Sequence, residues 1–118
     1  MRFLGGEGDD VIAIAPGAFR SHLVAPATFV IKKPVALSFE EAATLAVPFV
    51  TAWFCLHHVA RIRRGDRVLI HAAAGGVGQA AVQIASWHGA RVIGVVRRQE
   101  PYERHANSPV EIIDASAT

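Results

Sequence analysis

The 118-residue sequence has little cysteine and little net charge: one thiol and a formal charge of +2. A single cysteine cannot form an internal disulfide, so a disulfide-stabilised secreted fold is excluded and a reducing, cytoplasmic location is expected. That thiol, Cys55, lies in an apolar segment and is predicted to be buried and inert. The basic side chains form no dense stripe interleaved with aromatics, so no nucleic-acid partner is expected.

The sequence also lacks the spacing of a metal site, although it has six histidines. His57 and His58 are adjacent, so on a helix they point about 100° apart and cannot chelate as a pair four residues apart would. We expect no metal. The first ten residues carry Glu7, Asp9 and Asp10 where a signal peptide has an apolar core, so no secretion signal is expected.

Residues 42–60 contain no Lys, Arg, Asp or Glu, which raises the question of a membrane span. Threonines, histidines and Pro48 interrupt this stretch, so we expect buried helices of a soluble protein and no membrane partner. Proline removes a backbone donor and clashes with the preceding turn, so the sequence predicts two helices, over residues 39–45 and 48–59. Ser38 and Glu41 form the pattern of a capping box at the start of the first.

The most informative stretch is an apolar run, residues 68–71, followed by a glycine-rich turn and a predicted helix over residues 79–87. Glycine lets a backbone approach a pyrophosphate, and the helix N-terminus supplies N–H donors and a partial positive charge. Against the dinucleotide fingerprint G-x-G-x-x-G, the chain has Ala73 at the first position, then Gly75 and Gly78. The preceding strand and following helix make dinucleotide binding the leading interpretation.

Further strands are expected over residues 91–96 and 110–113, and a polar helix over residues 102–107. Strands that alternate with helices at this spacing predict parallel β–α–β units with right-handed crossovers. Nearer the N-terminus, residues 19–31 have strand-like composition. His71, which ends the first parallel strand, is expected to make a structural hydrogen bond.

The end of the strand over residues 91–96 indicates which dinucleotide is bound. NAD sites place an acidic residue there for the ribose 2′-hydroxyl, whereas this chain has Val96 followed by Arg97 and Arg98. Guanidinium groups bind a 2′-phosphate through charge-assisted hydrogen bonds, and a carboxylate would repel it. The sequence therefore favours NADP(H), although one or both arginines could instead be the solvated end of a strand.

Three stretches together resemble the medium-chain dehydrogenase/reductase superfamily: residues 37–45 (LSFEEAATL), 51–53 (TAW) and 65–78 (GDRVLIHAAAGGVG). The similarity is to its zinc-free members, the enoyl reductase domains of polyketide synthases and the quinone oxidoreductases. Residues 10–12 and 15–19 resemble the tail of that family's GroES-like substrate domain. The resemblance implies an α/β fold in two parts: residues 1–36 as a GroES-like remnant, and residues 37–118 as the N-terminal half of a doubly wound, Rossmann-type parallel sheet.

The resemblance also implies NADPH-dependent hydride transfer to the β-carbon of an activated alkene, followed by protonation of the α-carbon. Enoyl thioesters and quinones remain alternative substrates. A lysine that enoyl reductases often carry after the second strand is absent from residues 99–102, so no catalytic group is assigned. Asp114 matches an aspartate that recurs at the end of the third strand in relatives. A capping role for Asp114 is the alternative. By position, the pyrophosphate is assigned to Ala74, Gly75, Gly76, Val77 and Gly78, the nicotinamide neighbourhood to Thr51, and the 2′-phosphate to Arg97 and Arg98.

The strands that would complete the sheet are not in this sequence. Its first parallel strand is central in the family, and without its second neighbour it becomes an apolar edge that templates pairing. We therefore expect either self-association or the remainder of a larger reductase or synthase to cover it. An alternative of another class is a truncated, non-catalytic remnant that retains the nucleotide-binding fold.

Overall fold

The computed structural model describes residues 5–97 and 110–116, and the chain divides into two compact units, Met1–Val47 and Pro48–Thr118. The division falls inside helix α1 (Phe39–Trp53), later than the boundary after residue 36 that we expected. The polar helix predicted over residues 102–107 lies outside the described residues.

Unit 1 contains a short antiparallel ribbon. Strand β1 (Val11–Ala13) pairs with β2 (Val30–Lys32), with Ile12 opposite Ile31. A 3₁₀ turn, η1 (Ala27–Phe29), precedes β2. The strand predicted over residues 19–31 is therefore wrong except at its last two residues. Pro26, which has no N–H to donate to a ladder, precedes the turn instead.

Helix α1 begins as the sequence predicts. The Glu41 N–H donates to Ser38 Oγ at 3.1 Å, and the Ser38 N–H donates to Glu41 Oε2 at 2.9 Å, which completes the capping box. The break predicted at Pro48 is wrong: α1 runs through it to Trp53 and continues as a π-helix, η2 (Phe54–Val59). Beyond the proline, Ala52 and Leu56 are buried in the core of unit 2. We attribute the continuity to this packing, which offsets the proline's missing hydrogen bond.

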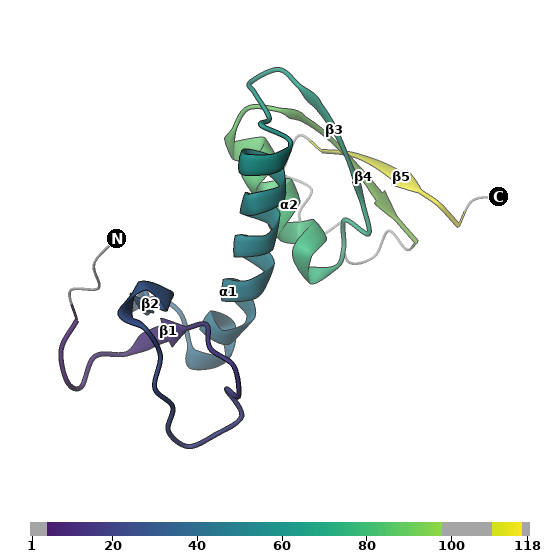
Figure 1. Ribbon diagram of the computed structural model, residues 1–118. Helices are drawn as coiled ribbons and strands as arrows, with labels where there is room; N and C mark the ends of the chain where they lie inside the picture. The colour runs from purple at the N-terminus through teal and green to yellow at the C-terminus, as the bar shows by residue number, and fades with distance from the viewer. Residues whose placement is uncertain (1–4, 98–109, 117–118) are drawn as a thin grey trace. The chain divides into compact units, whose positions relative to one another are not determined.

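Unit 2 is built on a three-stranded parallel sheet, which confirms the predicted fold class. Strands β3 (Arg67–His71), β4 (Arg91–Val96) and β5 (Val110–Asp114) lie in the order β3-β4-β5. Ile70 pairs with Gly94, and Gly94 with Ile112. The strands run side by side in Figure 1, and α2 (Gly76–Trp87) packs along β3 and β4.

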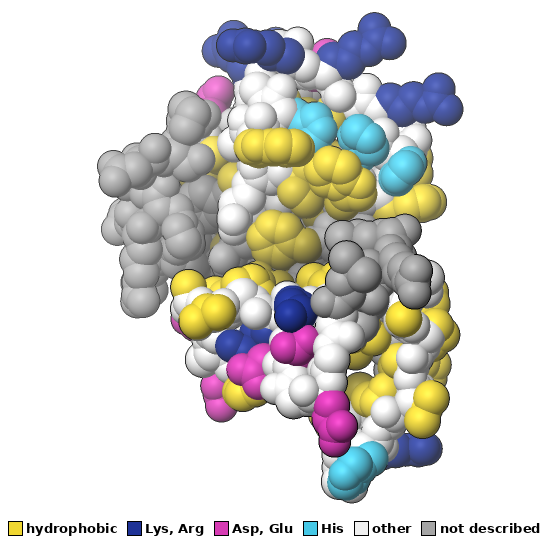
Figure 2. Space-filling view, turned by 90° about the vertical axis from the view of Figure 1, so that its left-hand side faces the viewer, with side chains coloured by type: hydrophobic (Ala, Val, Ile, Leu, Met, Phe, Trp, Pro, Cys, Tyr) yellow, Lys and Arg dark blue, Asp and Glu magenta, His cyan; other side chains and the backbone are white. Residues whose placement is uncertain are grey.

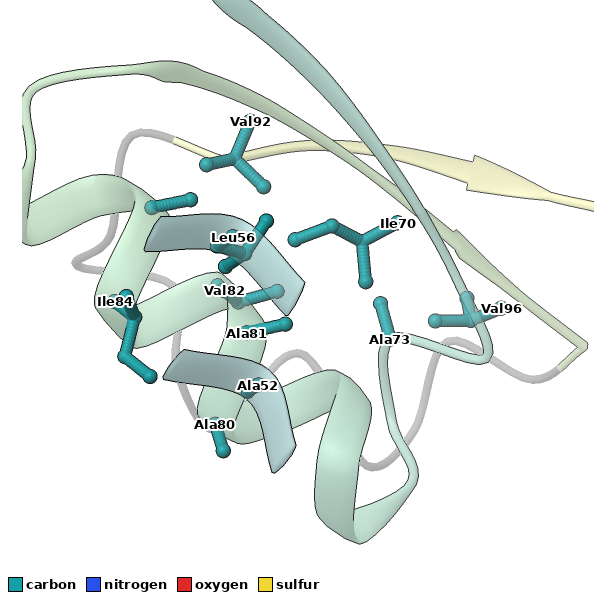
Figure 3. Close-up of a cluster of buried hydrophobic side chains, with 11 residues drawn as sticks. Ala52, Leu56, Ile70, Ala73, Ala80, Ala81, Val82, Ile84, Val92 and Val96 are labelled. Carbon is teal, nitrogen blue, oxygen red and sulfur yellow. The ribbon is translucent and has the colours of Figure 1, made fainter. Parts of the chain in front are cut away.

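Alternation along the strands places the core on one face of the sheet. Val92, Gly94 and Val96 of β4 are buried, whereas the residues between them are only half-buried. Figure 3 shows Ile70 and Val92 extending from the strands toward Leu56 and Val82. Small residues of α2 allow this close packing; they are Ala80, Ala81 and Ala85, each at most 9% exposed.

The other face of the sheet is open within the described residues. Leu69 is 55% exposed and Ile113 is 46% exposed, although parallel strands are ordinarily buried on both faces. Strand β3 also pairs on one side only, with β4, in the part of the chain that the structure describes. An apolar face and an apolar edge are thus left to solvent, as expected of half a doubly wound sheet.

Candidate functional site

The turn between β3 and α2 leaves the helix N-terminus free to bind an anion. Gly75 is the N-cap residue, with φ −77° and ψ 168°, and no side chain caps the helix. The first intrahelical bond runs from the Gln79 N–H to the Gly75 carbonyl at 2.8 Å, so the N–H groups of residues 76–78 have no partner within the helix. The first turn of α2 has no acidic residue. Its partial positive charge is therefore available to a phosphate.

The peptide that joins Ala74 to Gly75 is held at both ends. The Gly75 N–H donates to the Ala72 carbonyl at 2.8 Å, and Gln79 Nε2 donates to the Ala74 carbonyl at 2.7 Å. Ala72 itself has φ 50°, a left-handed conformation that is uncommon outside glycine. The glycine motif did not identify Gln79 as part of the site. The sequence feature that could have done so is its position directly after Gly78.

The three glycines of the turn have different surroundings. A Cβ on Gly78 would collide with the Ala72 carbonyl and lie 2.8 Å from the Cα of Ala73. A Cβ on Gly75 would lie 3.2 Å from the Ala72 oxygen, whereas one on Gly76 would meet only Pro48 Cγ, at 3.8 Å. Glycine is therefore required at position 78 for the close approach of turn and helix, whereas at position 76 the protein itself leaves room for a side chain.

The alanine at the first fingerprint position is accommodated by a neighbouring strand. Ala73 is fully buried, and its N–H donates to the Val95 carbonyl at 3.0 Å. A Cβ on Gly94 would lie 3.0 Å from the Ala73 Cβ and 3.1 Å from Ile112 Cδ1. Glycine at position 94 thus leaves the space that the Ala73 methyl group fills.

A cleft of about 620 Å³ opens beside this turn, at the carboxyl ends of the parallel strands. Ligands of open α/β sheets bind at this end. The structure thus brings Ala74, Gly75 and Arg97 of the predicted site together around one hollow. The lining residues are His71, Ala72, Ala74, Gly75, Val95, Val96, Arg97 and Ala115.

The charges near the cleft favour an anion at the end of β4. Arg97 is exposed and forms no ion pair among residues 5–97 and 110–116. Asp114, next to Ala115, accepts hydrogen bonds from the Ser116 hydroxyl at 2.6 Å and the Ser116 N–H at 2.8 Å. These bonds lower the pKa of Asp114, the hydroxyl contributing more. The hydrogen bonds of the Asp114 carboxylate are thus made within the turn after β5.

Five predicted site residues are not placed at the cleft. Gly76, Val77 and Gly78 form the first turn of α2 but are not among the lining residues. Thr51 is exposed on α1 and is not among the cleft's lining residues. Arg98 lies outside the described residues. The hydrogen bond expected for His71 is not found within the described part of the chain; its imidazole lines the cleft instead.

The other histidines of unit 2 that the structure describes, His57, His58 and His88, pack against aromatic rings. Trp53 stacks on His57 with ring centroids 4.5 Å apart, and His88 Nδ1 lies 2.9 Å from the Ile84 carbonyl oxygen. Because a carbonyl only accepts, Nδ1 of His88 carries the proton. Histidines lie beside hydrophobic side chains on the face in Figure 2. Among the described residues, no group of three or more His, Cys, Asp or Glu could hold a metal ion.

The segment from α1 through η2 is more exposed than expected. Cys55 is exposed, so the prediction of a buried thiol is wrong for this chain. The 21 residues of Phe39–Val59 have the length and hydropathy of a membrane span, and few of them are buried. The core helix of a soluble protein can meet the same two criteria. An exposed apolar helix is also what remains when the elements that pack on it lie outside the sequence.

A parallel strand, a tight glycine turn and an uncapped helix N-terminus at the mouth of a cleft define a dinucleotide-binding α/β fold. No protein-family model matches the chain. It is 51% identical over 85 residues to a phenolphthiocerol/phthiocerol polyketide synthase of Mycobacterium tuberculosis, covering 72% of the chain and 4% of the synthase.

Solved structures give the same relationship. The CurK enoyl reductase is 47% identical with a TM-score of 0.68, covering 76% of this chain and 27% of that one. The quinone oxidoreductase of Thermus thermophilus, whose complex with NADPH was also solved, is 35% identical with a TM-score of 0.79. That match covers 90% of this chain and 37% of the oxidoreductase. The chain belongs to the medium-chain dehydrogenase/reductase superfamily, among polyketide synthase enoyl reductases and quinone oxidoreductases. It spans well under half the length of these relatives.

Proposed function

We propose that this chain forms the adenosine- and pyrophosphate-binding half of an NADPH-dependent enoyl reductase of the polyketide synthase type. The observation that carries the proposal is the cleft at the strand ends, which joins the uncapped N-terminus of α2 to Arg97. The first binds a pyrophosphate, and the second offers a guanidinium to a 2′-phosphate. In the whole enzyme, NADPH would give a hydride to the β-carbon of an activated alkene, and a proton would go to the α-carbon.

The quinone oxidoreductases supply the second candidate function. The quinone oxidoreductase of Thermus thermophilus matches 90% of this chain with a TM-score of 0.79. Identity is higher to the enoyl reductase, 47% against 35%, which is why we place the enoyl thioester first. Zinc independence and a cytoplasmic location are part of the proposal, supported by the lack of metal-ligand spacing and by the single cysteine.

A graft tests the activity. We would replace the matching stretch of the CurK enoyl reductase by this chain and follow NADPH oxidation with a crotonyl thioester and with a quinone. The expected result is NADPH-dependent turnover of the thioester at a rate near that of CurK itself. The matching graft into the quinone oxidoreductase of Thermus thermophilus, followed with a quinone, tests the second candidate, and better function of that graft would favour it. A folded graft that binds NADPH but turns over neither substrate would support the alternative of a non-catalytic remnant.

The unpaired edge of β3 leads to a prediction about the isolated chain. Its backbone donors and acceptors face solvent beside exposed Leu69, and such an edge templates pairing. We expect the purified chain to sediment as a dimer or larger species at low micromolar concentration. In the CurK graft, where further strands complete the sheet, this association should be lost. A soluble, folded monomer of the isolated chain would contradict the prediction.

A further inference from the structure

His71 differs from the other described histidines in its lack of hydrogen-bond and aromatic partners within the described residues. His22 Nδ1 lies 3.1 Å from Ser21 Oγ, and His88 Nδ1 is 2.9 Å from the Ile84 carbonyl. His57 and His58 pack against Trp53 and Phe54. Neither a hydrogen bond nor an aromatic contact uses the His71 imidazole in residues 5–97 and 110–116.

The position of His71 directs it to the ligand cleft. It is the last residue of β3, opposite Val95 of β4, and it is exposed. Alternation along the strand buries its neighbour Ile70 against the core, so His71 lies on the other face. It lines the cleft together with Gly75, the N-cap of the helix that would hold the pyrophosphate.

Three elements bring charge to the neighbourhood of the cleft. The N-terminus of α2 is partially positive and has no acidic residue in its first turn. The cationic Arg97 follows strand β4, and strand β5 ends in Asp114, whose carboxylate accepts hydrogen bonds from Ser116. The cleft therefore favours an anion over a cation. An imidazole here is both a hydrogen-bond donor and, when protonated, a third positive group.

We infer that His71 is a cofactor-binding residue that donates a hydrogen bond to a pyrophosphate oxygen of the dinucleotide, an inference that depends on the proposed function. The pyrophosphate is chosen over the 2′-phosphate because His71 and Gly75 flank the same β3–α2 connection, whereas Arg97 follows the neighbouring strand, β4. NADH and NADPH share this pyrophosphate. His71 thus contributes to the binding of both, and Arg97 to the choice between them.

The test compares the unsubstituted chain with His71→Phe, which keeps a ring but no donor, and His71→Gln, which keeps a neutral donor. Binding of NADH and NADPH is followed by nicotinamide fluorescence, and thermal melting reports on folding. The same variants in the CurK graft repeat the measurement in a complete sheet.

We expect His71→Phe to weaken both cofactors by about tenfold, as loss of a hydrogen bond to a charged group does. His71→Gln keeps a donor and should restore most of the affinity. Unchanged affinity in His71→Phe overturns the inference, as does a loss confined to NADPH, or a loss that follows a lower melting temperature. If the unsubstituted chain and graft bind neither cofactor, the proposed function fails and the inference with it.

Discussion

Replacing Gly78 by alanine is expected to destabilise unit 2 by at least about 3 kcal/mol and to abolish cofactor binding. The added methyl group would collide with the Ala72 carbonyl and lie 2.8 Å from the Ala73 Cα. Both are backbone atoms, so neither can rotate away. Relief requires the helix to move off the turn, which separates the N–H groups of residues 76–78 from the cleft. Thermal melting and NADPH titration of the variant measure both consequences.

Gly76→Ala is the matched control, since it adds the same methyl group in the same turn. There the Cβ would meet only Pro48 Cγ at 3.8 Å, an ordinary contact. Alanine is also the better helix former, by about 1 kcal/mol in a helix interior. We expect melting to be unchanged or slightly higher, and binding to weaken only if the methyl group obstructs the phosphate. If both variants melt at the same temperature, the close approach at Gly78 does not carry the stability assigned to it.

The sequence was sufficient to predict the architecture of unit 2, because the glycine spacing and the apolar runs are local signals. The strand over residues 68–71, the following helix and the strand over residues 91–96 all form as expected. What the motif could not show was how Ala73 replaces the first glycine. The answer lies on β4, where Gly94 leaves room for the Ala73 methyl group. Such compensation joins residues on different strands, so only the paired sheet reveals it.

Two predictions about the segment from α1 through η2 were wrong, the break at Pro48 and the buried thiol, and both depend on tertiary packing. Proline rules describe an isolated helix, in which the lost hydrogen bond and the clash decide the outcome. Here Ala52 and Leu56 pack in the core of unit 2 beyond Pro48, and the helix persists. The exposure of Cys55 was missed because the apolar residues around it indicated burial, whereas hydropathy alone does not show which face of a helix is covered.

For the candidate site, residue types predicted which side chains would meet a ligand, and the fold shows which of them share a cleft. Arg97 was predicted from its position after the second parallel strand, and the structure places it on the same cleft as Gly75. Gln79 was missed because its role is a hydrogen bond to the Ala74 carbonyl, which no residue pattern encodes. Thr51 was assigned by resemblance alone and is not at the cleft, so its nicotinamide role stays a prediction.

Replacing Arg97 by alanine is expected to weaken NADPH roughly ten- to a hundredfold while leaving NADH nearly unchanged. Only NADPH carries the 2′-phosphate, and a charge-assisted hydrogen bond to it contributes about 1.5–3 kcal/mol. Arg97 lines the cleft and has no ion-pair partner among the described residues, so its guanidinium is available to a ligand. Arg98→Ala and the double variant show whether the second arginine shares this role.

Charge reversal sharpens the test. In Arg97→Glu, a carboxylate would repel the 2′-phosphate and could accept a hydrogen bond from the ribose 2′-hydroxyl, so the preference should move toward NADH. Arg91→Ala is a suitable control, because Arg91 is an exposed arginine at the opposite end of the same strand. It should leave both affinities as they are. Equal losses of NADPH and NADH in Arg97→Ala would mean that the arginine supports the fold, and the assignment of NADP(H) on this residue would be lost.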